Sequence, residues 1–380
     1  MDRRFFLAAS LGSLALPALV RAQEVSQRTR WKVRASEGFD ALAFLGPLAG
    51  RELYLKYYQN DAEAFAPRLS EPLRADIKAL WQEAEDSGFG LLGPGLSVFF
   101  SGNDDSSMAA LIESAAAPEA RLLASYRGSD KWDEKDWRWF LGVAPRLKMI
   151  FEAMQGAGFA AFRAERIGDL DRRIVQLQSD LGAYDVIRWH EKLTGRTFDP
   201  EIEVVLLQFC KPHGISVQGQ TFLQAADWNT PITVRVAAHE MLHPPVPMDG
   251  AAAIAALAAL ARDPLIPRIV KEHDPKWGYT TLEGLLNEDM AQALDQLISE
   301  ALGVGRNPAD RWRKADDGIH VLAGAIYGML RDDHWIDTGG SIEDWLAAAV
   351  KAGRFAPPRL HAVAARVLER PIDALWPLPA

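Results

Sequence analysis

One β-branched and largely apolar segment, FDPEIEVVLLQFC at residues 198–210, sets the tightest limit on the fold of this chain. Its β-branched residues, with Pro200 before them and Lys-Pro-His-Gly after them, predict a buried strand. Residues 214–225 alternate more loosely between apolar and polar, which predicts a second, half-exposed strand joined to the first by a hairpin over residues 211–214. Residues 229–243 follow with helical spacing, so two strands lead directly into a helix.

Helical periodicity dominates the rest of the chain. Apolar residues recur at three- and four-residue spacing over residues 37–58, 69–88, 134–159, 165–195, 249–263, 280–305, 318–333, 341–353 and 359–372. Residues 88–107 interrupt this pattern with glycines and a polar cluster, and predict a turn-rich connection. The expected fold class is α+β and mostly helical. A helical N-terminal region, residues 23–197, precedes a second domain, residues 198–380, which combines a small β-sheet, a helix bearing the candidate site and a helical C-terminal subdomain.

Residues 1–22 have the pattern of a bacterial export signal. A basic start is followed by an apolar run, a proline and the segment Val20-Arg21-Ala22, which fits cleavage after Ala22. The pair Arg3-Arg4 before Phe6-Leu7 resembles the twin-arginine signal, which predicts export of the folded protein to the periplasm. An ordinary secretory signal is the alternative, and in both cases the apolar run is too short for a permanent membrane anchor.

Composition excludes several classes of partner. The formal net charge is −9 and no basic block occurs, which excludes nucleic acid and anionic membranes as main partners. The chain has one cysteine, Cys210, and therefore cannot form an internal disulfide. Cys210 ends the apolar run and is expected to be a buried, unreactive thiol. His213 is near it in sequence, but no cysteine-hydrolase signature surrounds the pair.

The segment VRVAAHEMLHPP carries the strongest chemical signal. In a helix, His239 and His243 lie one turn apart on the same face, so both rings can bind one metal ion. Glu240, between them, can accept a proton from water beside that ion. The alternative is a pair of histidines that serve only a structural role near a helix C-terminus. A similar segment at His190 has Thr194 in place of the second histidine, and predicts an exposed helix end.

The spacing His-Glu-x-x-His is that of the zincins, and a second motif follows it. The segment Asn287-Glu288-Asp289-Met290-Ala291 resembles the Asn-Glu-x-x-Ala stretch that supplies the third zinc ligand in gluzincins, the thermolysin-like and aminopeptidase-like metallopeptidases. Over residues 200–300 the chain is similar to an exported bacterial protein of the gluzincin type. The resemblance implies a zincin-like core and one zinc ion held by His239, His243 and Glu288.

The position of the third ligand has alternatives. Asp249 has the short spacing that some zincins use, but Val246 stands where that pattern requires a glycine. Pro244 also disfavours helical geometry at His243, so the chain leaves the helix before it could reach a ligand at Asp249. A carboxylate from the helix expected over residues 280–305 is therefore favoured, and Asp249 stays open as the third choice.

Two glutamates on that later helix compete. Glu283 lies closer to the apolar stripe of the helix, whereas Glu288 shares its face with Gln292 and Asp295. Polar residues of this kind can orient a histidine ligand from behind. Glu288 is therefore preferred to Glu283, which stays open.

The resemblance implies peptide-bond hydrolysis in the periplasm, with water activated by zinc and Glu240 as general base. Peptides or proteins are the expected substrates, and the segment SVQGQTFLQA is the expected edge that pairs with them. Gluzincins often add a Tyr or His that holds the tetrahedral intermediate, and Tyr327, His320 and His334 are candidates, although core packing is the simpler role for each. A non-catalytic zinc-binding protein of the cell envelope and a hydrolase of another amide stay open.

Overall fold

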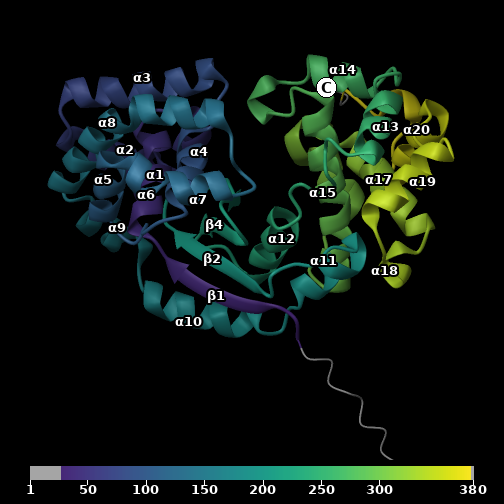
Figure 1. Ribbon diagram of the computed structural model, residues 1–380, viewed down its shortest axis with the longest axis horizontal. Coiled ribbons are helices and arrows are strands. Elements are labelled where there is room, and N and C mark those ends of the chain that lie inside the picture. The colour runs from purple at the N-terminus through teal and green to yellow at the C-terminus, as the bar shows by residue number, and fades with distance from the viewer. Residues whose placement is uncertain (1–26, 378–380) are drawn as a thin grey trace, which may run out of the picture.

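Strand β2 (Glu201–Leu207) lies at the centre of the structure, a computed structural model that describes residues 27–377 (Figure 1). Within those residues the sheet has four strands in the order β1-β2-β4-β3. Strands β1 (Arg30–Ala35) and β4 (Thr221–Ala225) flank β2 in parallel, and the short β3 (Ile215–Ser216) runs antiparallel to β4 at the edge. The expected export signal at residues 1–22 lies outside the described residues.

The buried strand predicted at residues 198–210 is confirmed as β2, but the prediction for the next segment is wrong in detail. Residues 214–225 form two strands, β3 and β4, and the hairpin joins these two rather than linking either to β2. The turn between them contains Gly219 with φ of +68°, a conformation that favours glycine and that reverses the chain here. Strand β4 is thereby free to pair in parallel with β2.

The two faces of the sheet pack against different groups of helices. Along β2, Val204 and Leu206 face one core, whereas Val205 and Leu207 face the other, as the two-residue period of a strand requires. This double burial explains why the second half of β2, residues 204–207, is continuously apolar instead of alternating. The sheet therefore separates two hydrophobic cores, and Figure 1 shows a group of helices on each side of it.

The N-terminal lobe packs on one face of the sheet. It consists of α1 (Glu37–Leu48), α2 (Glu52–Phe65), η1 (Ala66–Arg68), α3 (Glu71–Ser87), α4 (Leu92–Phe100), α5 (Met108–Ala116), α6 (Pro118–Arg121), α7 (Leu123–Gly128), α8 (Glu134–Gly156) and α9 (Phe159–Ile167). Helix α4 contradicts the turn-rich connection expected over residues 88–107. Leu92, Leu96 and Phe99 are buried along one face of this helix, and tertiary packing thus outweighs the low helix propensity of its glycines.

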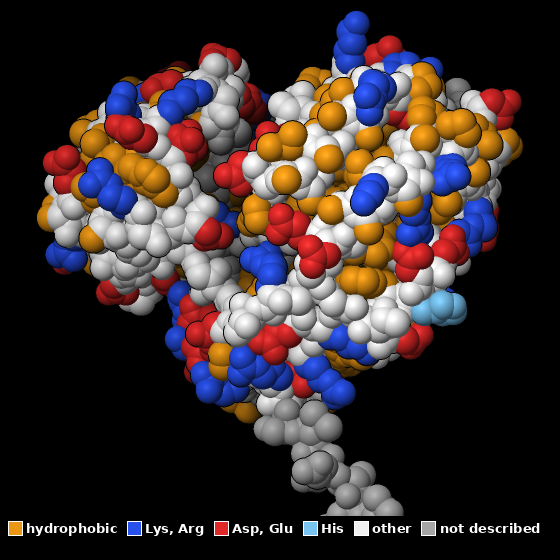
Figure 2. Space-filling view, turned by 45° about the vertical axis from the view of Figure 1, so that its right-hand side comes forward, with side chains coloured by type: hydrophobic (Ala, Val, Ile, Leu, Met, Phe, Trp, Pro, Cys, Tyr) orange, Lys and Arg blue, Asp and Glu red, His pale blue; other side chains and the backbone are white. Residues whose placement is uncertain are grey.

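The C-terminal lobe packs on the other face. It consists of α10 (Leu170–Leu181), α11 (Val186–Thr194), α12 (Thr230–Glu240), α13 (Ala251–Leu260), α14 (Ile266–Glu272), η2 (Pro275–Trp277), α15 (Leu282–Ala301), α16 (Pro308–Lys314), η3 (Ala315–Gly318), α17 (Val321–Asp332), α18 (Trp335–Thr338), α19 (Ile342–Lys351), α20 (Pro357–Leu368) and η4 (Ile372–Ala374). Figure 2 shows that the surface is hollowed between the two lobes. None of the described helices combines the length and hydropathy that a membrane crossing requires.

The two cores divide at the sheet, and segments from before residue 197 contribute to both of them. Strand β1 precedes that point but pairs along its whole length with β2, with Val33 beside Val204. Helices α10 and α11 also precede it, yet Leu177 and Ile187 belong to the core of the C-terminal lobe. The helical region and the sheet are thus interwoven in space.

Helix α15 forms the axis of the C-terminal lobe and positions the candidate site. Thr281 caps it, because its hydroxyl oxygen accepts a hydrogen bond from the Gly284 amide at 3.0 Å. Almost every residue from Leu285 to Ser299 is buried, polar residues included. Helix α12 packs against this buried helix, which brings the sequence motif of α12 to the polar side of α15.

Candidate metal centre

Helix α12 delivers the first two candidate ligands. The Asn229 side chain caps the helix by accepting the Ile232 amide at 3.0 Å, and Pro231 occupies the first turn, where no amide donor is needed. Helix α12 is shorter than the stretch 229–243 that has helical spacing, because it ends at Glu240. A tighter turn follows, in which the Leu242 amide donates to the carbonyl oxygen of His239 at 3.0 Å. This turn keeps the ring of His243 next to the ring of His239.

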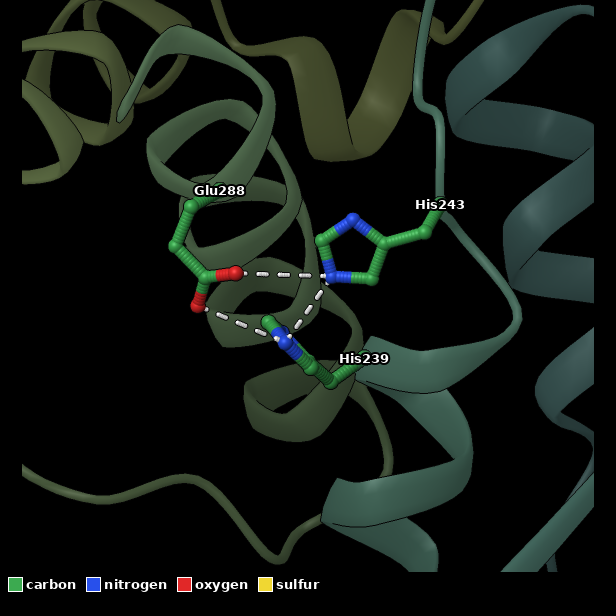
Figure 3. A group of neighbouring side chains, drawn as sticks. All are labelled: His239, His243 and Glu288. Atoms are coloured by element: carbon green, nitrogen blue, oxygen red, sulfur yellow. Dashed lines mark hydrogen bonds and ion pairs between the residues drawn. The ribbon is translucent and has the colours of Figure 1, made fainter. Parts of the chain in front are cut away.

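Three side chains converge at the end of α12 (Figure 3). The Nε2 atoms of His239 and His243 lie 3.1 Å apart. One carboxylate oxygen of Glu288, from α15, lies 3.5 Å from His239 Nε2, and the other lies 3.6 Å from His243 Nε2. The histidine side chains are 20% and 18% exposed and that of Glu288 is 12% exposed, so the trio is partly open to solvent.

The ring nitrogen of His239 that does not face the trio contacts a carboxylate. Its Nδ1 lies 2.8 Å from Asp295 Oδ2, and Arg311 Nη2 donates to the same oxygen at 2.8 Å. Burial lowers the pKa of His239, but Glu288 and Asp295 outweigh this effect and raise it to about 9. Burial raises the pKa of Asp295, but Arg311 and His239 bring it down to about 2, so Asp295 is an anion that fixes the orientation of the His239 ring.

His243 differs from its neighbour in charge. Burial and the nearby His239 lower the pKa of His243 to about 4, although Glu288 and the side chain of Asn287 act in the opposite direction. His243 is therefore neutral at pH 7, with an imidazole lone pair available for a metal ion. A cation between the two rings would displace the proton from His239, because both Nε2 atoms face the same point.

Glu288 is anchored by a buried polar network that extends along α15. The side-chain amide of Gln292 donates to Glu288 Oε1 at 2.9 Å, and Gln292 Oε1 accepts a hydrogen bond from the indole N–H of Trp312 at 2.7 Å. Behind Gln292, His320 Nδ1 lies 2.6 Å from Asp289 Oδ1. Burial raises the pKa of Glu288, but the adjacent histidines reverse this and lower it overall. The carboxylate is thus ionised and fixed, as a metal ligand requires.

Glu240 points from α12 toward the edge strand of the sheet. Its Oε2 accepts a hydrogen bond from the backbone amide of Ser216, in β3, at 3.0 Å. Gly214 allows this approach, because a Cβ atom there would lie 2.6 Å from Val236 Cγ1 and 3.3 Å from Glu240 Oε1. Burial and the charge of Glu288 raise the pKa of Glu240 to about 7, although His239 opposes the shift. A carboxylate with this pKa exchanges protons readily near neutral pH.

The alternative third ligands lie elsewhere. Glu283 and Asp249 are both exposed, and neither belongs to the group of converging ligand atoms. The helix-face argument for Glu288 agrees with this arrangement, since Gln292 and Asp295 do contact Glu288 and His239 from the same helix.

Three residues are candidates for stabilising a tetrahedral reaction intermediate. Two of them are hydrogen-bonded elsewhere, and the third is exposed. Tyr327 donates to Glu300 at 2.7 Å, and both ring nitrogens of His320 face carboxylates, those of Asp289 and Asp316. His334 is exposed on the surface. None of these three side chains contacts the trio directly.

Two other sequence predictions have clear outcomes. His190, expected at an exposed helix end, is fully buried, and its Nε2 lies 3.0 Å from the carbonyl oxygen of Ala238 in α12. That prediction is wrong, because α11 packs against α12 through this contact. Cys210 is buried and unpaired, and burial raises the pKa of its thiol well above the ordinary value, as expected of an unreactive cysteine.

Sequence reasoning missed several residues around the trio. Tyr279 lies beside Glu288, which together with burial raises the pKa of its phenol well above the ordinary value. Arg311 completes the support of His239 from α16, and Ser216 holds Glu240 through its backbone. Tyr279 and Arg311 show no motif or regular spacing, and Ser216 acts through an amide that every non-proline residue carries. No local signal could therefore have found them.

The distances within the trio fit a zinc ion. Two donors that are each about 2.1 Å from a tetrahedral zinc ion lie about 3.4 Å apart. The separations of 3.1, 3.5 and 3.6 Å among the two histidine nitrogens and the Glu288 oxygens are close to that value. Two imidazoles and one carboxylate also form a donor set that zinc uses in catalytic sites.

Comparisons with known proteins identify no relative of this chain. No family model, no curated protein and no solved structure matches the chain.

Proposed function

We propose that this protein is a zinc-dependent hydrolase that cleaves peptide bonds. The observation that carries the proposal is the convergence of His239, His243 and Glu288 at tetrahedral spacing, with Glu240 next to His239 in the chain. The same sequence features support a zincin-like core of the gluzincin type, and the export pattern in residues 1–22 supports action in the periplasm.

The residues of the site would have separate roles in binding the ion and in transferring the proton. His239, His243 and Glu288 would hold the ion, and Asp295 would keep His239 in the ligand orientation. When bound, zinc supplies a Lewis acid that polarises a carbonyl group and acidifies water. Glu240 takes the proton from the attacking water at its carboxylate and returns it to the leaving amine.

The edge strand next to Glu240 gives the substrate a place to bind. Among the described residues β3 pairs only with β4, and its Ser216 amide already lies at the carboxylate of Glu240. An extended peptide laid along this edge would run past the trio, because β3 and the end of α12 are joined by that contact.

Zinc content tests the first half of the proposal. Purified wild-type protein should hold one zinc ion per chain, and His239→Ala should hold much less than one. Asp249→Ala, which removes an exposed carboxylate, should keep the full amount. Stoichiometric zinc in His239→Ala would refute the ligand assignment.

Activity on a peptide library tests the second half. Glu240→Gln keeps the size of the side chain and removes the base, so we expect a loss of about 10²- to 10⁴-fold in kcat with zinc still bound. Glu283→Gln, an exposed glutamate on α15, is the matched control and should retain full activity. Equal activity of Glu240→Gln and wild type would exclude this mechanism.

A non-catalytic zinc protein is the second candidate. The observation in its favour is that Tyr327, His320 and His334, considered as partners of a reaction intermediate, all lie away from the trio or are occupied. Stoichiometric zinc combined with no cleavage by the wild type of any peptide or other amide would favour this candidate over the hydrolase.

A further inference from the structure

Two carbonyl groups flank the segment that carries the histidines of the candidate metal centre. The Ala238 carbonyl lies one residue before His239, and the Pro244 carbonyl lies one residue after His243. Helix α11 and the turn that follows it supply a hydrogen-bond donor to each of these carbonyl groups. Figure 1 shows α11 beside α12. Both ends of the segment are therefore attached to one neighbouring element.

The Ala238 carbonyl loses its usual partner because α12 ends here. In a continued helix the Leu242 amide would donate to it, but that amide donates to the carbonyl oxygen of His239 instead, at 3.0 Å. The end of a helix leaves such carbonyl groups without a partner, which is unfavourable where they are buried. His190 Nε2 lies 3.0 Å from the Ala238 oxygen. A carbonyl oxygen can only accept, so this nitrogen carries the hydrogen and donates.

A histidine at position 190 has a cost that an apolar residue would not have. The ring of His190 is fully buried, and its Nδ1 atom has no hydrogen-bond partner among the described residues. A buried acceptor without a partner costs about 1–3 kcal/mol. What distinguishes histidine from an apolar residue at this position is therefore the donor that reaches Ala238.

Arg196 holds the other end of the segment. Its Nη1 atom donates to the carbonyl oxygen of Pro244 at 2.6 Å and to that of Pro245 at 3.4 Å. Pro244 and Pro245 have no amide hydrogen, so their backbone can form hydrogen bonds only as an acceptor. The guanidinium of Arg196 supplies the donor that this part of the backbone needs.

The C-terminal end of α11 is itself attached to the C-terminal lobe. The indole N–H of Trp335, in α18, donates to the carbonyl oxygen of Leu193 at 2.9 Å. The Gly340 amide donates to the carbonyl oxygen of Lys192, also at 2.9 Å. These contacts fix the end of α11, and a fixed element can position the segment that it contacts.

We propose that His190 and Arg196 are positioning residues, which fix the backbone on either side of the two histidine ligands so that both rings face one metal ion. This inference rests on the proposed function, because it concerns the same ion. Asp295 orients the ring of His239 directly, whereas His190 and Arg196 act on the backbone. Without either contact, the ion would have to order this segment when it binds, and its affinity would fall.

Zinc affinity of the full chain, measured by competition with a chelator, tests the role of His190. His190→Leu removes the donor, and we expect zinc to bind about tenfold or more weakly. His190→Gln keeps a side-chain N–H donor and should bind zinc within about threefold of wild type. Leu177→Ala, on α10, removes a fully buried side chain from the same core and should lower stability without weakening zinc binding. Equal zinc affinity in His190→Leu and wild type, or equal losses in the two His190 variants, would overturn the inference.

The same measurement tests Arg196 with a matched arginine. Arg196→Met should weaken zinc binding by about threefold or more, which is a smaller effect than that of His190→Leu because an exposed hydrogen bond contributes less. Arg188→Met replaces an exposed arginine on α11 and should bind zinc as wild type does. Unchanged affinity in Arg196→Met would also overturn the inference.

Hydrogen exchange of the metal-free protein separates this inference from the proposed function. Relative to Leu177→Ala, His190→Leu should speed the exchange of the Met241 and Leu242 amides, which bond across the end of α12, by about tenfold or more. A wild type that binds no zinc would contradict the proposed function. A wild type that binds zinc, with unchanged exchange in His190→Leu, would contradict only the positioning roles of His190 and Arg196.

Discussion

The two lobes cover opposite faces of one sheet, yet different types of residue fill their interiors. In the N-terminal lobe, the ring of Phe44 lies against those of Phe65, Phe159, Phe162 and Phe209, with centroids 4.3 to 5.8 Å apart. In the C-terminal lobe, the central helix buries a series of polar residues, namely Glu288, Asp289, Gln292, Asp295, Gln296 and Ser299.

This difference indicates where the chemistry lies. Burying a polar group is costly unless it is hydrogen-bonded, so a core needs a reason to contain many of them. Most of these polar residues are hydrogen-bonded, and Gln292 and Asp295 hold Glu288 and His239 in fixed positions. The aromatic lobe has no comparable network in the described residues and acts mainly as a support.

The largest effect on stability should come from the aromatic core. Phe44→Ala removes a fully buried ring, and we expect a loss of about 3–5 kcal/mol in the free energy of unfolding. Urea denaturation followed by tryptophan fluorescence measures this loss. The molecules that remain folded should bind zinc as wild type does, since Phe44 lies in the other core.

Met149→Ala is the control for this comparison. Met149 is 54% exposed on the same lobe, and its loss should change the stability by less than about 0.5 kcal/mol. If Phe44→Ala weakened zinc binding more than it lowered stability, the division of roles between the lobes would be wrong.

An intermediate effect is expected from the polar network, and it should fall on zinc affinity. Asp295→Asn keeps the shape of the side chain but removes the charge that orients His239, and we expect zinc to bind about 10- to 100-fold more weakly. Competition with a chelator of known affinity measures the change. Asp310→Asn, an exposed residue on α16, should leave the affinity unaltered. Equal zinc affinity in Asp295→Asn and wild type would show that the network is only structural.

The smallest effect concerns the buried charge of the N-terminal lobe. Asp40 accepts hydrogen bonds from the side chain of Arg163 and from the Phe209 amide, with Tyr58 and Cys210 nearby. Burial raises the pKa of Asp40 to about 6, although Arg163 opposes the shift. Because the folded-state pKa exceeds the unfolded value of about 3.9, this group adds stability at low pH, and its contribution is lost as the pH rises through 6.

A pair of denaturation series tests this pH dependence. Between pH 5 and pH 7, wild type should lose about 1 kcal/mol more stability than Asp40→Asn, in which the titrating group is absent. Other titrating groups contribute equally to both proteins and cancel in the difference. Parallel pH profiles for the two proteins would contradict the raised pKa.

Local sequence signals were sufficient for the elements that meet at the candidate site. The β-branched, apolar segment predicted β2, and helical spacing over residues 229–243 and 280–305 predicted α12 and α15. Helix geometry alone placed Glu288, Gln292 and Asp295 on one face, and the structure brings that face to His239.

What the sequence could not show depends on contacts between distant segments. Strand β1 alternates basic and apolar residues, and its partner β2 follows about 170 residues later in the chain. No local sequence pattern therefore predicts that these two strands pair. Helix α4 forms in spite of its glycines because its apolar face is buried. Tyr279 lies beside Glu288 only because of the packing of the C-terminal lobe.

The shared sheet has a consequence for the order in which the chain is made. The core of the N-terminal lobe includes Val205, Leu207 and Leu223, which leave the ribosome long after the helices they cover. Those helices must therefore wait, with apolar faces exposed, until β2 and β4 have been synthesised. We expect the nascent chain to depend on chaperones until about residue 225 has emerged, because only then can the core of the N-terminal lobe close.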